Sequence, residues 1–177
     1  MTPSQFSDQW KRSPITRYRL SSPLAEGLSA AAASALREYG LPQTAEPWLS
    51  FAEYVRIDSH TSSELDKRGF YPIGSLANGS FICIEKKSGR AVIFDPNDPD
   101  EDWVLNSSLE ALYESVFLYD AFIEEVNRRN PAFSSDFKIP DGMLSELTRS
   151  LTACDPDAIN RQGFWHCELK ALDDSIF

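Results

Sequence analysis

Residues 69–95 read Gly-Phe-Tyr-Pro-Ile-Gly-Ser-Leu-Ala-Asn-Gly-Ser-Phe-Ile-Cys-Ile-Glu-Lys-Lys-Ser-Gly-Arg-Ala-Val-Ile-Phe-Asp and predict a β-hairpin. Phe81–Ile84 and Ala91–Phe94 are short apolar runs rich in β-forming residues, and turn residues bound each of them. Between the two runs, Gly89 is the residue type that best tolerates the positive φ of a short hairpin loop. A second tight turn is expected at Asn78-Gly79. Because neither run alternates between apolar and polar residues, we expect the hairpin at the centre of a sheet covered on both faces.

The segment that follows the hairpin predicts a loop, a strand and a helix. Asp95–Asp102 is acidic and contains two prolines, so it cannot form the interior of a helix or strand. Trp103–Leu105 predicts another short strand. Ser107-Ser108-Leu109-Glu110 then fits a capping box, in which the first serine and the glutamate satisfy free backbone N–H groups reciprocally. Apolar residues continue at helical spacing as far as Val126, which indicates an amphipathic helix.

The rest of the chain predicts further helices around this sheet. Ser22-Pro23 begins a run of leucines and alanines that predicts a helix with proline at its first position, ended by Gly40. Residues 130–140 predict a loop. Three more elements are expected: a strand at Tyr54–Ile57, a helix from Gly142 to Leu151 capped by Asp141, and a terminal helix through Trp165 to Leu172. This order is typical of an α+β fold around an antiparallel sheet.

Several short motifs stand in a recognisable order along the chain. They are Tyr39–Pro42, Tyr71–Ser75, Phe81–Ile84, Gly89–Val92, Leu105–Leu109, and Asp155–Asp157 followed by Phe164-Trp165. No single motif is specific, because Ile-Gly and Ser-Ser steps are common, but the ordered set resembles the SUKH superfamily. This superfamily includes yeast cell-wall regulators and many bacterial immunity proteins. The chain is most similar to the fourth SUKH group, the immunity proteins paired with polymorphic toxins, from about Leu24 to Leu172.

The resemblance implies both a fold and a function. The expected fold is a single SUKH-like α+β domain, with a central antiparallel β-sheet and flanking helices, over residues 21–177. Residues 1–20 would form an N-terminal arm. The implied function is that of a non-enzymatic immunity protein that binds and neutralises a cognate toxin by occlusion. An intracellular scaffold or regulatory protein-binding module of the same fold is the alternative.

Composition fits a folded protein in the cytoplasm. The 177 residues are 42% hydrophobic and 12% aromatic, which is sufficient for one core. There is no run of about 18 apolar residues, so no membrane span is expected. The N-terminus lacks the apolar region of a signal peptide. Three widely spaced cysteines indicate reduced thiols.

Charge restricts the kinds of partner. A net charge of −10 would repel phosphate backbones, so nucleic acid is not expected as a ligand. The charge fits either an ordinary acidic surface or an acidic face that complements a basic partner, such as a nuclease toxin. Residues 10–12 and 17–19 are basic and aromatic instead. We expect this arm to fold over the acidic surface of the protein itself.

Catalytic and metal-binding signals are weak. His60 and His166 are the two histidines, and a small hydrolase that uses one of them is the third functional hypothesis. His166 and Cys167 are neighbours on a predicted helix, where adjacent side chains point about 100° apart, so they do not form a catalytic dyad. The cysteines lack zinc-site spacing, and Gly74–Gly79 does not fit a phosphate-binding loop. We therefore expect no catalytic residues, no cofactor and no metal.

The acidic segment is the predicted partner-binding site. Its carboxylates are Asp95, Asp98, Asp100, Glu101 and Asp102, and no lysine or arginine lies among them. Pro96 and Pro99 lower the entropy lost when the loop is ordered by a partner. The competing interpretation is a solvated connection between strands.

The four tryptophans are expected to differ in burial. Trp103 and Trp165 each begin an apolar run at a predicted element, which favours the core. Trp10 and Trp48 lie in less regular sequence and are candidates for exposed anchors.

Overall fold

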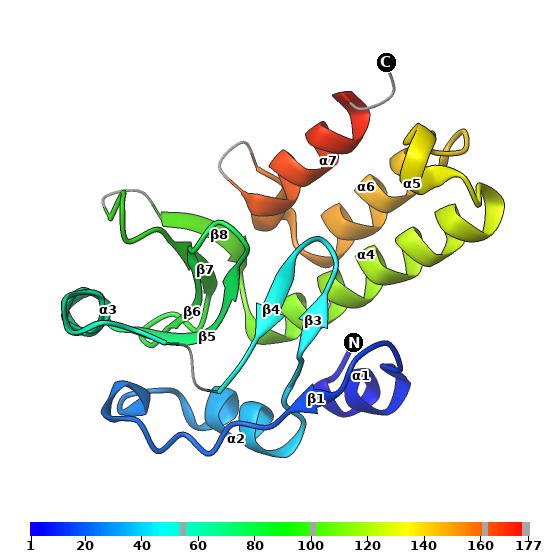
Figure 1. Cartoon of the computed structure of the whole chain (residues 1–177). Coiled ribbons are helices and arrows are strands. Elements are labelled where there is room, and N and C mark those ends of the chain that lie inside the picture. Colours follow the sequence, from blue (N-terminus) through cyan, green and yellow to red (C-terminus); the bar gives the residue numbers. More distant parts are fainter. Residues whose placement is uncertain (54–55, 100–101, 161–162, 175–177) are drawn as a thin grey trace.

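A six-stranded antiparallel sheet forms the centre of the molecule. The computed structural model describes residues 1–53, 56–99, 102–160 and 163–174. The strands follow chain order across the sheet: β3 (Thr44–Ala45), β4 (Leu49–Phe51), β5 (Phe70–Leu76), β6 (Phe81–Glu85), β7 (Ala91–Phe94) and β8 (Asp102–Asn106). The predicted α+β class with a central antiparallel sheet is therefore confirmed (Figure 1).

The predicted hairpin is the β6–β7 pair. Phe81 lies opposite Phe94 and Ile84 opposite Ala91, so both apolar runs are paired over their whole length. Gly89 in the connecting turn has a φ of 80°, a backbone conformation that strains residues with a Cβ atom. Both the hairpin and its glycine turn are confirmed.

Each face of this hairpin packs against a different layer. Ile82 and Ile84 point into the larger core, which also contains the buried face of helix α4 (Leu109–Arg129). Cys83 and its neighbours on the other face pack against Leu65 of α3 (Ser59–Arg68). Figure 1 shows α3 and α4 on opposite sides of the sheet. Burial on both faces explains why the strands lack polar alternation.

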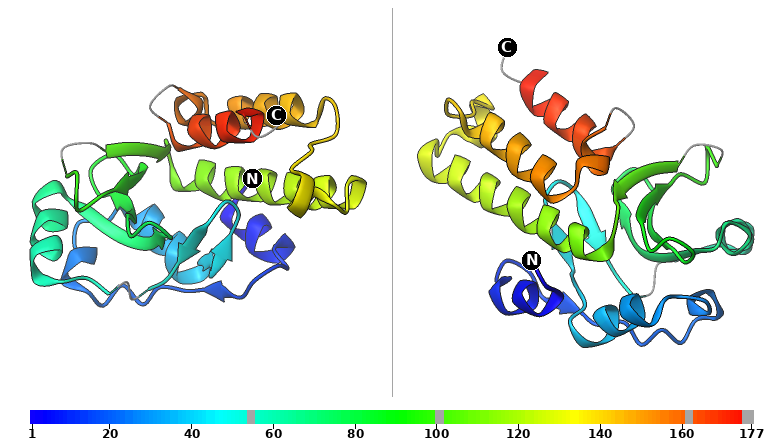
Figure 2. Two further views of the ribbon diagram at one scale, coloured as in Figure 1. Left: turned by 45° about the horizontal axis from the view of Figure 1, so that its top comes forward. Right: turned by 180° about the vertical axis from the view of Figure 1, so that it is seen from behind.

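The remaining helices fall into two groups, one beside α4 and one formed by the N-terminal part of the chain. The structure has α5 (Phe133–Asp136), α6 (Met143–Cys154) and α7 (Phe164–Asp174), together with α1 (Pro3–Gln9), α2 (Ala30–Glu38), and the 3-10 helices η1 (Pro23–Ala25) and η2 (Pro156–Ile159). A small two-stranded sheet pairs β1 (Ile15–Thr16) with β2 (Leu41–Pro42). The α6 helix lies between α4 and α7 (Figure 2). Among the described helices, none has the length and apolar character needed to cross a membrane.

Several expected element boundaries were wrong. The helix expected to begin at Pro23 is two elements, because Ser29 caps α2 separately with a side-chain hydrogen bond. Ser108, rather than Ser107, caps α4. The cap of α6 is Gly142, not Asp141, and the expected loop at 130–140 contains α5.

The strand expected at residues 54–57 is also wrong. Leu49–Phe51 forms the strand in this region. Arg56 and Ile57 belong to no strand, while Tyr54 and Val55 lie outside the described residues.

The first twenty residues pack against the rest of the chain. Phe6 and Tyr18 are buried in the main core, and Trp10 is only 5% exposed, so the expectation that Trp10 is an exposed anchor was wrong. Arg12 forms ion pairs with Asp120 at 2.7 Å and Glu124 at 3.4 Å. These pairs join the basic arm to acidic residues of α4. The division into residues 1–20 and 21–177 stays a prediction.

Candidate functional site

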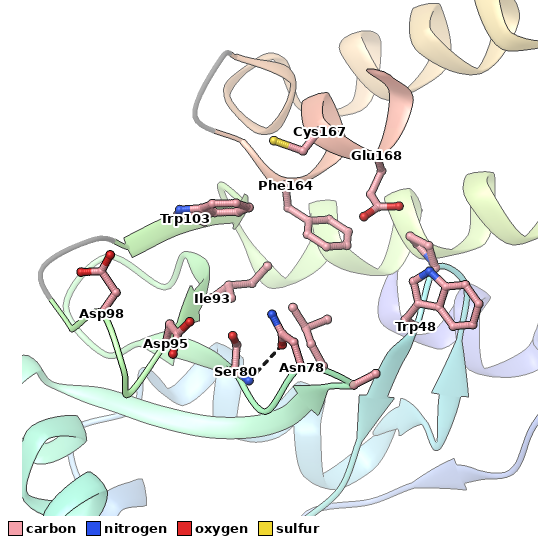
Figure 3. A pocket seen from close by; sticks show the side chains of 13 residues that line it. Trp48, Asn78, Ser80, Ile93, Asp95, Asp98, Trp103, Phe164, Cys167 and Glu168 are labelled. Carbon is pink, nitrogen blue, oxygen red and sulfur yellow. Dashed lines mark hydrogen bonds between the residues drawn. The ribbon is translucent and has the colours of Figure 1, made fainter. Parts of the chain in front are cut away.

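A pocket of about 360 Å³ lies between the sheet and the first turn of α7. Its floor includes Leu76 at the end of β5, Ile93 of β7 and Phe164 of α7. The connection between β3 and β4 forms one end of the pocket, and β8 with the acidic loop forms the other (Figure 3). The pocket therefore joins segments that are far apart in the sequence.

Two exposed tryptophans stand at opposite ends of the pocket. Trp48 is 73% exposed and Trp103 is 45% exposed, although both are large apolar side chains. The expected exposure of Trp48 is confirmed, whereas the assignment of Trp103 to the core was wrong. Trp103 lies opposite Ile93 on the edge strand β8, so its ring forms a wall of the pocket rather than packing inside the core. Exposed tryptophans beside a pocket are typical of protein-binding surfaces.

The backbone holds Trp48 in an unusual conformation. Trp48 is the last residue of a three-residue turn, Glu46–Trp48, and its φ is 64°. For a bulky residue this left-handed region is strained, by about 1–3 kcal/mol. Strained residues persist where the surrounding structure holds them in place. They are found most often at functional sites. The conformation of Trp48 thus supports a role for this end of the pocket.

Three carboxylates surround the apolar pocket. Asp95 and Asp98 come from the acidic loop, and Glu168 comes from α7 (Figure 3). The pocket lining contains no lysine or arginine among the described residues, and none of the three carboxylates forms an ion pair within that part of the chain. Burial raises the pKa of the Glu168 carboxyl above its ordinary value. The pocket is therefore apolar inside and negatively charged around it.

The predicted acidic site is divided by the structure. Asp95 and Asp98 line the pocket, and the Asp95 carboxylate also accepts a hydrogen bond from the Asn97 backbone N–H at 2.8 Å. Asp102 instead forms an ion pair with Arg68, whose guanidinium lies 5.7 Å from the ring centre of Phe94. Asp100 and Glu101 lie outside the described residues.

A buried polar network fixes the position of α7 beside the sheet. The Asn106 side-chain amide donates to Ser115 Oγ at 2.9 Å and to Asp155 Oδ2 at 3.0 Å. The same Asp155 oxygen accepts the Ser107 backbone N–H at 2.7 Å. The Trp165 Nε1–H donates to Asn106 Oδ1 at 3.1 Å, and Trp165 is fully buried as expected. This network connects the end of β8 to α4, to the residue that precedes η2 and to the first turn of α7.

The residue before α7 also allows a close approach. A Cβ atom on Gly163 would lie 2.2 Å from the carbonyl oxygen of Ala158, which is closer than any real contact. Gly163 also pairs with Val104 of β8. With α7 placed in this way, Phe164, Cys167 and Glu168 share one helical face toward the pocket.

Sequence reasoning identified one edge of this pocket and missed the other. Glu168 and Phe164 were not candidates, although their i, i+4 spacing on an amphipathic helix puts them on one face. That spacing does not tell which surface the face meets. The placement of this helix face beside the same pocket as Trp48 depends on tertiary packing, which local patterns do not encode.

The described residues contain no grouping suited to metal chemistry. No set of three or more His, Cys, Asp or Glu side chains in that part of the chain is arranged to hold a metal ion. His60 lies on α3, whereas His166 lies on α7. Cys83 is buried, and burial raises the pKa of its thiol.

One comparison with known proteins gives a match. The family described as SUKH-4 immunity protein matches residues 19–171. The matched range includes Trp48 and Trp103, the two tryptophans at the pocket, and the face of α7 that lines the pocket. No curated protein and no solved structure matches the chain significantly.

Proposed function

The chain belongs to the SUKH-4 immunity protein family, and we propose that it neutralises a cognate protein toxin by binding it directly. The binding is one-to-one and occludes the toxin without chemical modification. The protein acts in the cytoplasm of the cell that it protects. The partner has a basic surface, as a nuclease toxin domain would, because this chain carries a net charge of −10.

The observation that best supports this proposal is the pocket with Trp48 and Trp103 at its ends. Large apolar side chains at 73% and 45% exposure are unfavourable in water and are enriched in the energetically important centres of interfaces. The surrounding carboxylates favour a basic partner. Together these features fit a surface for protein recognition.

We propose that the acidic loop contributes the electrostatic part of the interface. Its contacts to basic toxin residues would come from Asp95, Asp98, Asp100, Glu101 and Asp102. Asp102 is expected to contribute less than the others, because it already forms an ion pair with Arg68 of the same chain. Such charges chiefly accelerate association and set specificity, whereas apolar anchors supply most of the affinity.

Survival of toxin-expressing cells tests the function. The candidate toxin would be the product of a large secreted-toxin gene immediately upstream of the gene of this chain. Cells that express its toxic domain should survive when this chain is co-expressed, and the two proteins should copurify at equal stoichiometry. Protection without a stable complex would contradict direct occlusion.

A further inference from the structure

We propose that the pocket beside α7 receives a single arginine side chain of the toxin, with its guanidinium group between the Trp48 indole and the Glu168 carboxylate. This inference rests on the proposed function. It adds the chemistry of the side chain that is recognised and the residues that recognise it.

The geometry at this end of the pocket suits a planar cation. Figure 3 shows the Glu168 carboxylate pointing into the space between the Phe164 ring and the Trp48 indole. The two rings supply apolar and π surfaces, and the carboxylate supplies two hydrogen-bond acceptors. A side chain that enters here meets an aromatic face and a negative charge together.

The charge at this position has no cationic partner within the described chain. No lysine or arginine in that part of the protein forms an ion pair with Glu168, and none lines the pocket. Arg12 lines a neighbouring hollow beside Trp48, but Asp120 and Glu124 bind its guanidinium. Glu168 is partly buried, so its charged form loses hydration without gaining a counter-ion. A cation from a partner would supply that counter-ion.

Arginine fits this environment better than lysine. A guanidinium group stacks on aromatic faces, binds a carboxylate with two parallel hydrogen bonds, and is more weakly hydrated than an ammonium group. The pocket volume of about 360 Å³ lies at the lower end of the range for ligand sites. It therefore suits one side chain that projects from a loop rather than a whole helix of the partner.

The first test uses a minimal probe and the four indole N–H signals in a ¹⁵N–¹H correlation spectrum. The protein is titrated with Nα-acetyl-arginine methylamide and, in parallel, with its neutral isostere Nα-acetyl-citrulline methylamide. The Trp48 indole signal should shift with the arginine probe and stay in place with citrulline. Trp10 and Trp165 serve as internal references, because their indole N–H groups are bonded to Ser13 and Asn106.

The second test measures toxin binding with matched variants. Glu168→Gln should weaken the complex at least about tenfold, and Trp48→Ala should have an effect of similar size. Asp173→Asn is the control for the carboxylate, since Asp173 is exposed on the same helix and does not line the pocket. Phe137→Ala is the control for the aromatic, because Phe137 is 55% exposed and lies elsewhere. Both control variants should bind the toxin as the parent does.

The outcomes separate this inference from the proposed function. Equal shifts with arginine and citrulline, or toxin binding unchanged in Glu168→Gln, would overturn the arginine pocket while protection from the toxin still stands. Absence of protection together with an arginine-selective shift would contradict the proposed function and leave the chemistry of the pocket established. An arginine-selective shift combined with weakened toxin binding supports the inference.

Discussion

One residue at the pocket, Trp48, combines exposure with backbone strain. Trp48 has a φ of 64° and exposes 73% of its surface, so it gains little from burial while its backbone is strained. A residue chosen for stability alone would be glycine or asparagine, which tolerate this region. The conflict between local preference and observed residue is the pattern expected at a functional position.

Trp48→Asn tests this conflict. Asparagine accepts the left-handed conformation, so the free energy of unfolding should rise by about 0.5–1 kcal/mol, while toxin binding weakens. Urea unfolding of the parent and variant measures the first effect. A loss of more than about 1 kcal/mol would show instead that the indole packs in a way that stabilises the fold.

The Asp155 carboxylate is the acceptor on which the buried network depends. Asp155→Ala removes the acceptor of the Ser107 N–H and one of the two acceptors of the Asn106 amide, which keeps its hydrogen bond to Ser115. The free energy of unfolding should fall by about 2–4 kcal/mol, since hydrogen bonds to charged acceptors are among the stronger ones. Asp157→Ala is the matched control, because Asp157 is exposed in the 3-10 helix η2, which begins directly after Asp155. Equal stability of the two variants would rule out a structural role for the network.

Asp120 predicts a particular pH dependence of stability. Burial raises the pKa of this carboxyl from 3.8 to about 6, although the nearby Arg12 opposes the shift; Glu124 and Glu46 reinforce it. The folded protein therefore holds the proton more tightly than the unfolded chain, and stability falls as pH rises from about 4 to about 6.

Asp120→Asn should abolish this component of the pH dependence. Chemical unfolding of the parent and variant between about pH 4 and 7 should show the parent losing stability relative to the variant as pH rises. Glu124→Gln changes the same ion-pair cluster but keeps Asp120, so a reduced dependence should persist in that control, because burial is the main cause of the raised pKa. A constant difference in stability between parent and Asp120→Asn across this range would contradict the assignment.

At the scale of secondary-structure elements, predictions succeeded where a single element carries its own signal. The β6–β7 hairpin combines two apolar runs with a glycine turn, and α4 has a long apolar stripe. Predictions failed where two nearby signals compete. Pro23 is a favourable start for a helix, but Ser29 caps α2 further along the chain, and the two signals produce separate elements.

The burial of a side chain depends on which other element covers it. Trp103 lies in a strand as predicted, yet the edge position of β8 leaves it at the pocket rather than in the core. Trp165 is buried because Tyr119 of α4 packs against its ring and Asn106 accepts its indole N–H hydrogen bond. Both tryptophans begin apolar runs in the sequence, so the local pattern cannot distinguish them.

Gly89→Val tests the hairpin turn itself. A β-branched residue at a φ of 80° is strained, so the free energy of unfolding should fall by about 1–3 kcal/mol. Gly89→Asn is the control, because asparagine tolerates the same conformation at less cost. Steric clash does not confuse the comparison, since a Cβ atom at this position would meet nothing within 4 Å. Equal stability of the valine and asparagine variants, measured by thermal unfolding, would exclude backbone strain as the determinant.

At the scale of the whole molecule, charge and apolar surface meet in one region. The net charge of −10 repels other acidic proteins and attracts basic ones. Basic residues of the chain are partly neutralised internally, as Arg12 and Arg68 show. Asp95, Asp98 and Glu168 remain beside the apolar pocket, so a basic partner that binds there would meet negative charge and apolar surface together.

The acidic loop is expected to control how fast the toxin associates. A variant with amides in place of four loop acids, at Asp95, Asp98, Asp100 and Glu101, keeps Asp102 and its ion pair with Arg68. Association should slow about tenfold at low salt and become less sensitive to salt, while unfolding stays nearly unchanged. Stopped-flow mixing over a series of salt concentrations measures both effects.

A second charge-matched variant distinguishes a local contact from the overall charge of the protein. It replaces three aspartates and one glutamate that are exposed and do not line the pocket, namely Asp141, Glu146, Asp157 and Asp173. Both variants change the net charge by the same amount, so a purely global effect would slow association equally in the two. If the loop meets the toxin, the loop variant should be slower than the control, because attraction between charges declines within about 10 Å at moderate salt. Equal rates would make the loop a solvated connection, and the binding surface would then be defined by the pocket and its tryptophans.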